Sequence, residues 1–204
     1  MTIDNFDLLK NIIKPESEDD FWFGQIICRR KDIPDLPRAD KLIKSYYINN
    51  LEYSESKKEE IMQLCNLFHG RFYLNPNPRS YKEVNLEMAA AAIKNTLNSS
   101  EHTIIKKLES ICGYHNTPGR EKIWVIDVDN KSIKEDWIVD QLNSVMPSAK
   151  IKNKYIATFP TLHGYHILCT PFDRVNFNRL TETVKNDITV HTNSPTLIYF
   201  NEDI

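Results

Sequence analysis

The sequence predicts an α+β fold, with a mixed and partly antiparallel sheet flanked by helices. Two observations lead to this prediction: helical and extended segments alternate along the chain, and several of the last extended segments follow each other without a helix between them. The chain has 204 residues, of which 41% are hydrophobic and 26% charged, a balance typical of folded globular proteins. Such a length holds one domain with a sizeable core, or one domain with an appendage.

Residues 1–120 are expected to form an α/β part that packs on the core. Segments rich in aromatic and β-branched residues predict three strands in this part. The three strands are expected within Phe21–Asp32, Lys41–Ile48 and Arg71–Pro78. A serine followed three positions later by a glutamate is a capping box, which starts a helix. Two helix starts are expected on this ground, at Ser56 with Glu59 and at Ser80 with Glu83. A third helix, TIIKKLESIC, is expected to end at Gly113.

Residues 121–204 are expected to belong to the same domain and to carry its catalytic motifs. The segment KIWVIDVD predicts a strand, and Ser132 with Glu135 predicts the start of the helix that follows it. The segments KYIATF and YHILCTPF predict two strands of a hairpin. A short helix with Asp173 as its N-cap comes next. The segments DITVHT and TLIYF predict a final pair of strands around the turn NSP.

Composition and targeting signals predict a cytoplasmic protein without a membrane partner. The N-terminus is acidic and has no long apolar stretch, and no segment reaches 18 apolar residues. Four cysteines lie far apart within apolar segments, with no Cys-x-x-Cys pair, so we expect buried thiols in a reducing compartment rather than a structural zinc site. The formal charge of −2 argues against a basic coat, although a local basic groove is compatible with it.

The most informative segment is Lys122–Asn130, KIWVIDVDN, because a strand of large apolar residues ends in two carboxylates. Residues two apart in a strand point to the same face, so Asp127 and Asp129 are expected to lie side by side. Two neighbouring carboxylates repel each other unless a cation lies between them, and Mg²⁺ and Mn²⁺ prefer oxygen ligands. The alternative is a strand that runs into solvent, with Asp129 capping the following turn.

Two later segments carry further candidates. His166 is expected on a strand after a turn that contains His163, where an imidazole can donate to a phosphate oxygen. The alternative is a core histidine with satisfied hydrogen bonds. Asp187 begins the expected strand DITVHT, where its alternative role is that of a turn residue.

Taken together, these segments resemble the catalytic core of archaeo-eukaryotic primases and primase-polymerases. The family's first motif is a hydrophobic segment followed by Asp-x-Asp or Asp-x-Glu, which WVIDVD matches. Its second is a small residue, any residue and histidine, matched by Gly164-Tyr165-His166. Its third is an acidic residue in a hydrophobic strand, matched by Asp187 in NDITV, with Glu182 or Glu202 as substitutes. The match spans about Ile123 to Phe200.

The resemblance implies a nucleotidyl transferase with an RNA-recognition-motif-like core, which uses Mg²⁺ or Mn²⁺. Asp127, Asp129 and Asp187 would hold the metals, and His166 would contact the phosphates of the incoming nucleotide, with His163 close by. The implied partners are a nucleic acid template, nucleoside triphosphates and replication proteins. Glycine stands at 164 where the family usually has serine, which removes a hydroxyl near the nucleotide. No zinc-binding element or helicase domain is present, as in a minimal, phage-type member.

Nucleic acid and triphosphates require cationic contacts, and three arginines are the main candidates. They are Arg71, Arg79 and Arg120, and further candidates are Arg29, Arg30, Lys31, Lys150, Lys152 and Lys154. Solvated surface charge is the alternative for most of them. Three aromatic residues, which could equally belong to the core, offer surfaces on which bases stack. They are Phe72, Tyr73 and Tyr81.

Three other functions were weighed against nucleotidyl transfer. A metal-dependent nuclease uses the same carboxylates for hydrolysis, without nucleoside triphosphates. A non-catalytic, primase-like protein would bind nucleic acid or a partner through the same fold. A 2H phosphoesterase would use His191 in VHTNS, but the second His-x-Thr/Ser motif that such enzymes need is missing.

Overall fold

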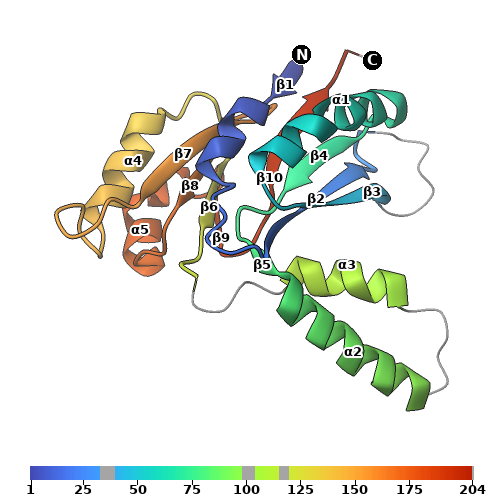
Figure 1. The fold of residues 1–204 in the computed structure, drawn as a ribbon. Coiled ribbons are helices and arrows are strands. Elements are labelled where there is room, and N and C mark those ends of the chain that lie inside the picture. Colours follow the sequence, from blue (N-terminus) through green and yellow to red (C-terminus); the bar gives the residue numbers. More distant parts are fainter. Residues whose placement is uncertain (33–39, 98–103, 115–119, 204) are drawn as a thin grey trace.

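The computed structural model describes residues 1–32, 40–97, 104–114 and 120–203. It consists of two antiparallel sheets with helices on their outer sides (Figure 1). This arrangement confirms the predicted α+β class. The two ends of the chain meet, because the first strand pairs with the last one along Thr2–Asn201 to Asp4–Tyr199.

The first sheet has the strand order β1-β10-β4-β2-β3, with β5 paired to β2 outside this path. Its strands are β1 (Thr2–Asp4), β2 (Asp20–Cys28), β3 (Lys41–Ile48), β4 (Arg71–Leu74), β5 (Arg79–Ser80) and β10 (Thr196–Asn201). The three strands expected in the first part of the chain are therefore present. β2 ends at Cys28, so the basic residues that follow it lie beyond the sheet.

The second sheet has the order β7-β8-β6-β9, and all neighbouring strands are antiparallel. Its strands are β6 (Trp124–Val128), β7 (Tyr155–Pro160), β8 (Tyr165–Cys169) and β9 (Ile188–His191). Two helices connect them, α4 (Glu135–Ser144) after β6 and α5 (Arg174–Leu180) after β8. The resulting βαββαβ connectivity is that of ferredoxin-like units, in which both helices cover one face of the sheet.

β6 is an interior strand that is buried on both faces, as predicted. Val125 belongs to the cluster between the two sheets, together with Ile26 and Phe72 of the first sheet. Ile126 and Val128 point the other way and belong to the cluster formed with α4 and α5. Alternation along β6 therefore directs Asp127 toward the first sheet, on the same face as Val125. This orientation places the predicted site between the sheets.

β10 corrects two expectations about the end of the chain. It does not pair with β9, as the sequence suggested, but crosses to the first sheet and lies between β1 and β4. The two expected parts, residues 1–120 and 121–204, therefore do not coincide with the two sheets. The crossing follows from burial: β10 is buried over residues 196–200, which an interior position in the larger sheet provides.

The first-sheet helices begin and end differently from some expectations. α1 (Leu51–Phe68) starts before Ser56, because Asn50 caps it by accepting the Tyr53 N–H at 2.7 Å. The capping box at Ser80 is confirmed, since its hydroxyl accepts the Glu83 N–H at 3.1 Å at the start of α2 (Tyr81–Leu97). α3 (Ile104–Tyr114) continues through Gly113, so this glycine is not its cap.

Two helix starts in the second half have different outcomes. Asp173 caps α5 as predicted, by accepting the Asn176 N–H at 3.1 Å. The predicted start at Ser132 is wrong, because α4 begins at Glu135 after Lys134. Ser132 lies in a turn, where its N–H donates to the Asn130 side chain at 2.9 Å.

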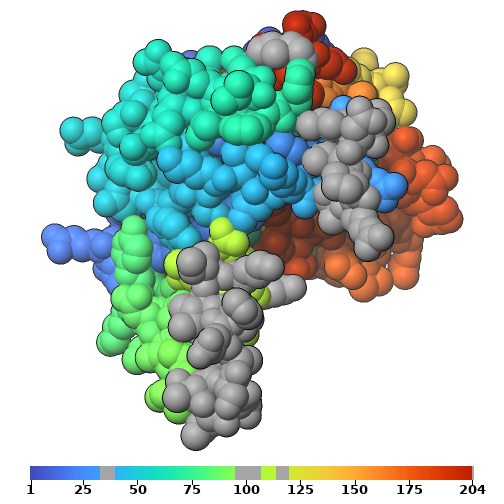
Figure 2. Space-filling view, turned by 90° about the vertical axis from the view of Figure 1, so that its right-hand side faces the viewer, coloured from blue at the N-terminus to red at the C-terminus, as the bar shows by residue number. Residues whose placement is uncertain are grey.

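Short 3-10 helices and a helical hairpin complete the fold. The 3-10 helices are η1 (Phe6–Asn11) and η2 (Glu182–Val184). α2 and α3 project from the rest of the molecule (Figure 1), and α2 extends at its lower edge in Figure 2. All four cysteines are buried, as expected. Among the helices of the described ranges, none has the length and apolar character needed to cross a membrane.

Candidate active site between the two sheets

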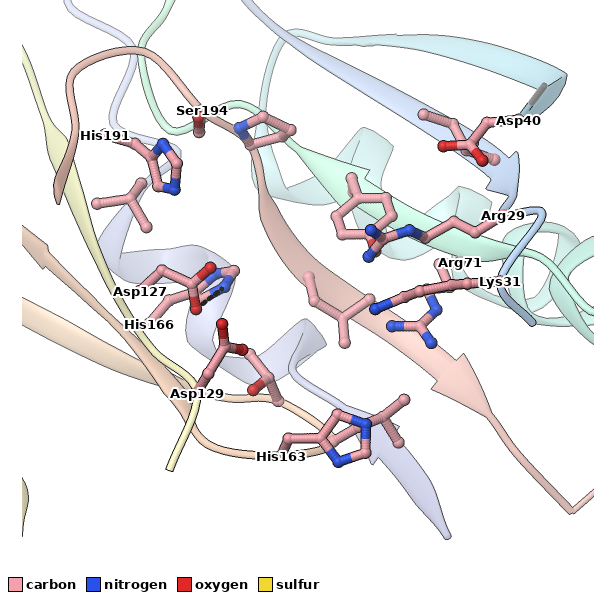
Figure 3. A pocket seen from close by; sticks show the side chains of 17 residues that line it. Arg29, Lys31, Asp40, Arg71, Asp127, Asp129, His163, His166, His191 and Ser194 are labelled. Atoms are coloured by element: carbon pink, nitrogen blue, oxygen red, sulfur yellow. Dashed lines mark hydrogen bonds and ion pairs between the residues drawn. The ribbon is translucent and has the colours of Figure 1, made fainter. Parts of the chain in front are cut away.

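A cavity of about 310 Å³ opens between the two sheets. Its cationic lining comes from the first-sheet side: Arg71 on β4, and Arg29 and Lys31 just beyond β2. The opposite wall comes from the second sheet and carries carboxylates and imidazoles, namely Asp127, Asp129, His166 and His191. Figure 3 shows the two groups facing each other across the opening. His163 lies at one end of this wall, in the turn between β7 and β8.

Asp127 and His166 form the centre of the second-sheet wall. They are direct cross-strand partners in the β6–β8 register, and His166 Nε2 lies 3.3 Å from Asp127 Oδ1. On its other side, His166 Nδ1 lies 2.9 Å from the hydroxyl of Thr196, which is fully buried on β10. A neutral His166 that donates from Nε2 to Asp127 accepts the Thr196 hydrogen, whereas a protonated one donates at both nitrogens. Either way, His166 ties the second sheet to the first.

The charge of Asp127 is favoured by its surroundings. Burial alone would raise its pKa, but the hydrogen bond from His166 and the positive charges of His166, His191 and Lys31 outweigh this effect. The pKa of Asp127 is therefore lowered, and the side chain is a carboxylate at neutral pH. A partly buried carboxylate beside imidazoles is a suitable ligand for a divalent cation.

Asp129 lies nearer the mouth of the same cavity. It follows the last residue of β6, and its side chain is exposed, whereas Asp127 is half-buried. Its carboxylate makes no hydrogen bond or ion pair with any described residue. The predicted pair thus shares one cavity, and Asp129 does not cap the turn before α4, since Asn130 does so through the Ser132 N–H.

Asp187 is placed differently from the two other aspartates. It is not among the described residues that line the cavity, and it lies one residue before β9. It holds the site through its backbone instead, because its carbonyl accepts the Asp129 N–H at 2.9 Å. The suggested substitutes are elsewhere too: Glu182 pairs with Lys185, and Glu202 lines a neighbouring cavity. In this conformation, the described residues bring no three His, Cys, Asp or Glu side chains together closely enough to hold a metal ion.

Gly164 is explained by the close approach of two backbone segments. A Cβ atom built at this position would lie 1.7 Å from the carbonyl oxygen of Val128 and 3.2 Å from the Asn130 nitrogen. The β7–β8 turn therefore packs directly on the end of β6, beside Asp129. No serine fits here, and the departure from the family pattern is a condition of this packing rather than the loss of a group at the nucleotide.

The cations of the first-sheet wall are held by neighbours. Arg71 donates to Asp32 through two parallel hydrogen bonds of 2.7 Å, and its guanidinium lies 4.4 Å from the centre of the Phe200 ring. Arg29 donates to the Tyr73 hydroxyl at 3.2 Å. Two parallel bonds fix the plane of a guanidinium, so Arg71 presents its charge in a defined direction. The prediction for Arg71 as a cavity residue agrees with its position.

The structure does not place Arg79 and Arg120 at the cavity, contrary to the expectation for nucleotide-binding residues. Arg79 is fully buried and donates to the carbonyls of Asn77 at 2.8 Å and Cys112 at 2.5 Å. Burial lowers its pKa to about 10. Arg120 forms ion pairs with Asp20 and Glu16. Both arginines join chain segments that are distant in the sequence, which single-sequence patterns do not reveal.

The remaining candidates divide in the same way. Tyr73 lines the cavity, but Phe72 is fully buried in the core and Tyr81 stacks on Phe21 with ring centres 4.3 Å apart. Lys154 is buried and donates to the Val145 carbonyl at 3.0 Å.

Two site residues lacked a clear signal in the sequence. Thr196 was not considered, and it is identified only by the crossing of β10 to the first sheet. His191 was considered only as part of a missing phosphoesterase motif, although the alternation within DITVHT could have placed it two positions beyond Thr189 on one face.

No protein-family model matches this chain, and neither the curated proteins nor the solved structures include one that is significantly similar to it.

Proposed function

We propose that this protein is a metal-dependent nucleotidyl transferase of primase-polymerase type, which uses nucleoside triphosphates and acts on nucleic acid. One observation carries the proposal: a cationic wall of Arg29, Lys31 and Arg71 faces Asp127 and Asp129 across one cavity. Triphosphates are polyanions that need cations on one side, and their transfer commonly needs divalent metals held by carboxylates on the other.

The carboxylate wall fits Mg²⁺ or Mn²⁺ through the chemistry of its donors. Asp127 is ionised and Asp129 has no partner among the described residues, so both have oxygen atoms available for a metal. A bound divalent ion would activate the attacking hydroxyl and neutralise charge on the phosphates. His166 would keep the orientation of Asp127 through its bonds to Asp127 and Thr196, because ligands held by a second hydrogen bond present one geometry to the metal.

The cationic wall would orient the triphosphate. Arg71 is fixed by Asp32 and therefore acts as a rigid positive charge, whereas Lys31 is exposed at the rim and can follow the phosphates. The cavity volume of about 310 Å³ is at the lower end of the range typical of small-molecule sites. It suits the polyphosphate and sugar, with the nucleic acid outside.

The proposal is tested by nucleotide incorporation. Wild-type protein is incubated with labelled nucleoside triphosphates, a primed and an unprimed template, and Mn²⁺ or Mg²⁺. We expect extended products from the wild type and none from Asp127→Ala/Asp129→Ala. Asp7→Asn is the matched control, because it changes an exposed carboxylate on η1, which does not line the cavity.

The same assay separates the alternative functions. Metal-dependent cleavage of the template without triphosphates, lost in the double variant, would identify a nuclease instead. Nucleic acid binding that is equal in wild type and double variant, with no product in either, would identify a non-catalytic binding protein.

A further inference from the structure

β9 contributes a histidine, and not a carboxylate, to the cavity. This strand covers Ile188–His191 and contains no acidic residue. In the β6–β9 register, Asp127 lies opposite Thr189 and Val125 lies opposite His191. His191 is therefore on the same face as Asp127 and is its diagonal neighbour, and it lines the cavity.

The two histidines beside Asp127 differ in their partners. Both ring nitrogens of His166 are engaged, by Asp127 and by Thr196. The ring of His191 makes no hydrogen bond or ion pair with any described residue, and the same holds for the Asp129 carboxylate. Figure 3 shows His191 and Asp129 on opposite sides of Asp127, along the same wall. Two unpartnered donor groups thus flank the ionised carboxylate.

The spacing of these residues fits a common cation. Diagonal neighbours on adjacent antiparallel strands are about 7–8 Å apart, and metal–ligand bonds to imidazole or carboxylate are about 2.0–2.2 Å long. An imidazole extends farther from its backbone than a carboxylate, so His191 can reach a metal that Asp127 and Asp129 hold. Rotation of side chains brings the three groups together, and the paired strands stay in place.

We propose that Asp127, Asp129 and His191 form a mixed carboxylate–imidazole metal site, in which His191 takes the place that the family resemblance assigns to Asp187. The site deepens the proposed nucleotidyl transfer and rests on it for its use, although metal binding itself does not require that activity. Imidazole is a good ligand for Mn²⁺, Co²⁺ and Zn²⁺, whereas Mg²⁺ strongly prefers oxygen. The site therefore favours transition metals over Mg²⁺.

Metal binding without nucleotide tests this site directly. Calorimetric titration measures Mn²⁺ and Mg²⁺ affinity, and the visible spectrum of bound Co²⁺ reports a nitrogen ligand. We expect wild type to prefer Mn²⁺, and His191→Gln to lose at least about tenfold in Mn²⁺ affinity together with the nitrogen-dependent Co²⁺ band. Asp187→Asn and His163→Gln should leave both readouts at the wild-type value.

A second variant asks whether position 191 sets the metal preference. His191→Asp restores a third carboxylate, so we expect Mg²⁺ affinity to rise relative to Mn²⁺. Thermal melts of all variants show whether they are folded. The inference is overturned if the wild type binds no divalent metal, if His191→Gln binds Mn²⁺ as well as wild type, or if Asp187→Asn weakens binding equally.

The outcomes distinguish this inference from the proposed function. A His191-dependent metal site in a protein that incorporates no nucleotide refutes the transferase and leaves the metal site standing. Nucleotide incorporation that is unaffected by His191→Gln, with unchanged metal affinity, supports the transferase and refutes the metal site.

Discussion

The two walls of the cavity differ in how their polar groups are satisfied. On the first-sheet wall, Arg71 is paired with Asp32, and Arg29 donates to Tyr73. On the second-sheet wall, only Asp127 is paired, with His166, while Asp129 and His191 have no partner within the described residues. The first wall is thus preformed by its own neighbours, and the second has donor groups available for a ligand. A site of this kind binds an anion on one side and a cation on the other.

The largest effect is expected where the second-sheet wall meets the β7–β8 turn. In Gly164→Ala, the new Cβ meets the Val128 carbonyl at 1.7 Å, so the turn or the end of β6 must move. We expect a loss of about 3 kcal/mol in the free energy of unfolding, and displacement of Asp129. Denaturant unfolding measures this loss. Gly113→Ala is the matched control, because nothing lies within 4 Å of its added Cβ, and wild-type stability there would support the steric explanation.

Removing cations from the first-sheet wall sharpens the contrast between structure and binding. Arg71→Gln leaves Asp32, whose side chain is 15% exposed, without its partner, and we expect a loss of about 2–3 kcal/mol in stability. Lys31→Gln should leave the melting temperature unchanged and weaken triphosphate binding, with a reduced dependence on salt. Thermal melts and binding titrations at two salt concentrations give both values. Equal melting temperatures for the two variants would show that Arg71 does not stabilise this wall.

The pair at the centre of the second-sheet wall should act through geometry. His166→Ala removes the group that orients Asp127, and we expect Mn²⁺ affinity to fall by about 10–100-fold. Thr196→Val removes only the outer hydrogen bond and should cost about 1 kcal/mol, or a few-fold in the same affinity. If Thr196→Val has the larger effect, the link to the first sheet dominates over the contact with Asp127.

The smallest effect is expected outside the cavity, on the far side of the first sheet. Hydrogen bonds from Lys44, Tyr46 and Lys57 lower the pKa of Glu60 from 4.5 to about 2. A lowered pKa stabilises the fold above the ordinary value, and this contribution is lost as the pH falls from about 4.5 toward 2. Glu60→Gln should therefore lower stability slightly at pH 7 and flatten its decline in that acidic range. An unchanged pH profile of unfolding would show that these bonds do not stabilise the fold.

Local patterns in the sequence predicted much of the fold. Alternation placed Asp127 and Asp129 in one cavity, and the cap at Asp173 starts its helix as expected. The starts at Ser56 and Ser132 failed because a capping box is a short pattern, and Asn50 provides a competing cap for the first of them.

The composition of the site depended on long-range pairing that local patterns do not contain. β10 crosses to the first sheet and brings Thr196 to His166, while the β6–β9 register directs His191 into the cavity. Arg79 and Arg120 look like other surface cations in the sequence, yet tertiary contacts engage both away from the cavity. Gly164 looked like a lost functional group, although the backbone of Val128 leaves no room for a side chain.

Binding of a nucleoside triphosphate with and without Mn²⁺ tests the central claim, that the two walls bind one anion and its cation together. We predict that Mn²⁺ strengthens triphosphate binding to the wild type, and that Asp127→Asn/Asp129→Asn abolishes this gain while retaining the weak metal-free binding to the cationic wall. Triphosphate binding that does not respond to Mn²⁺, or a gain that persists in the double variant, would contradict the account.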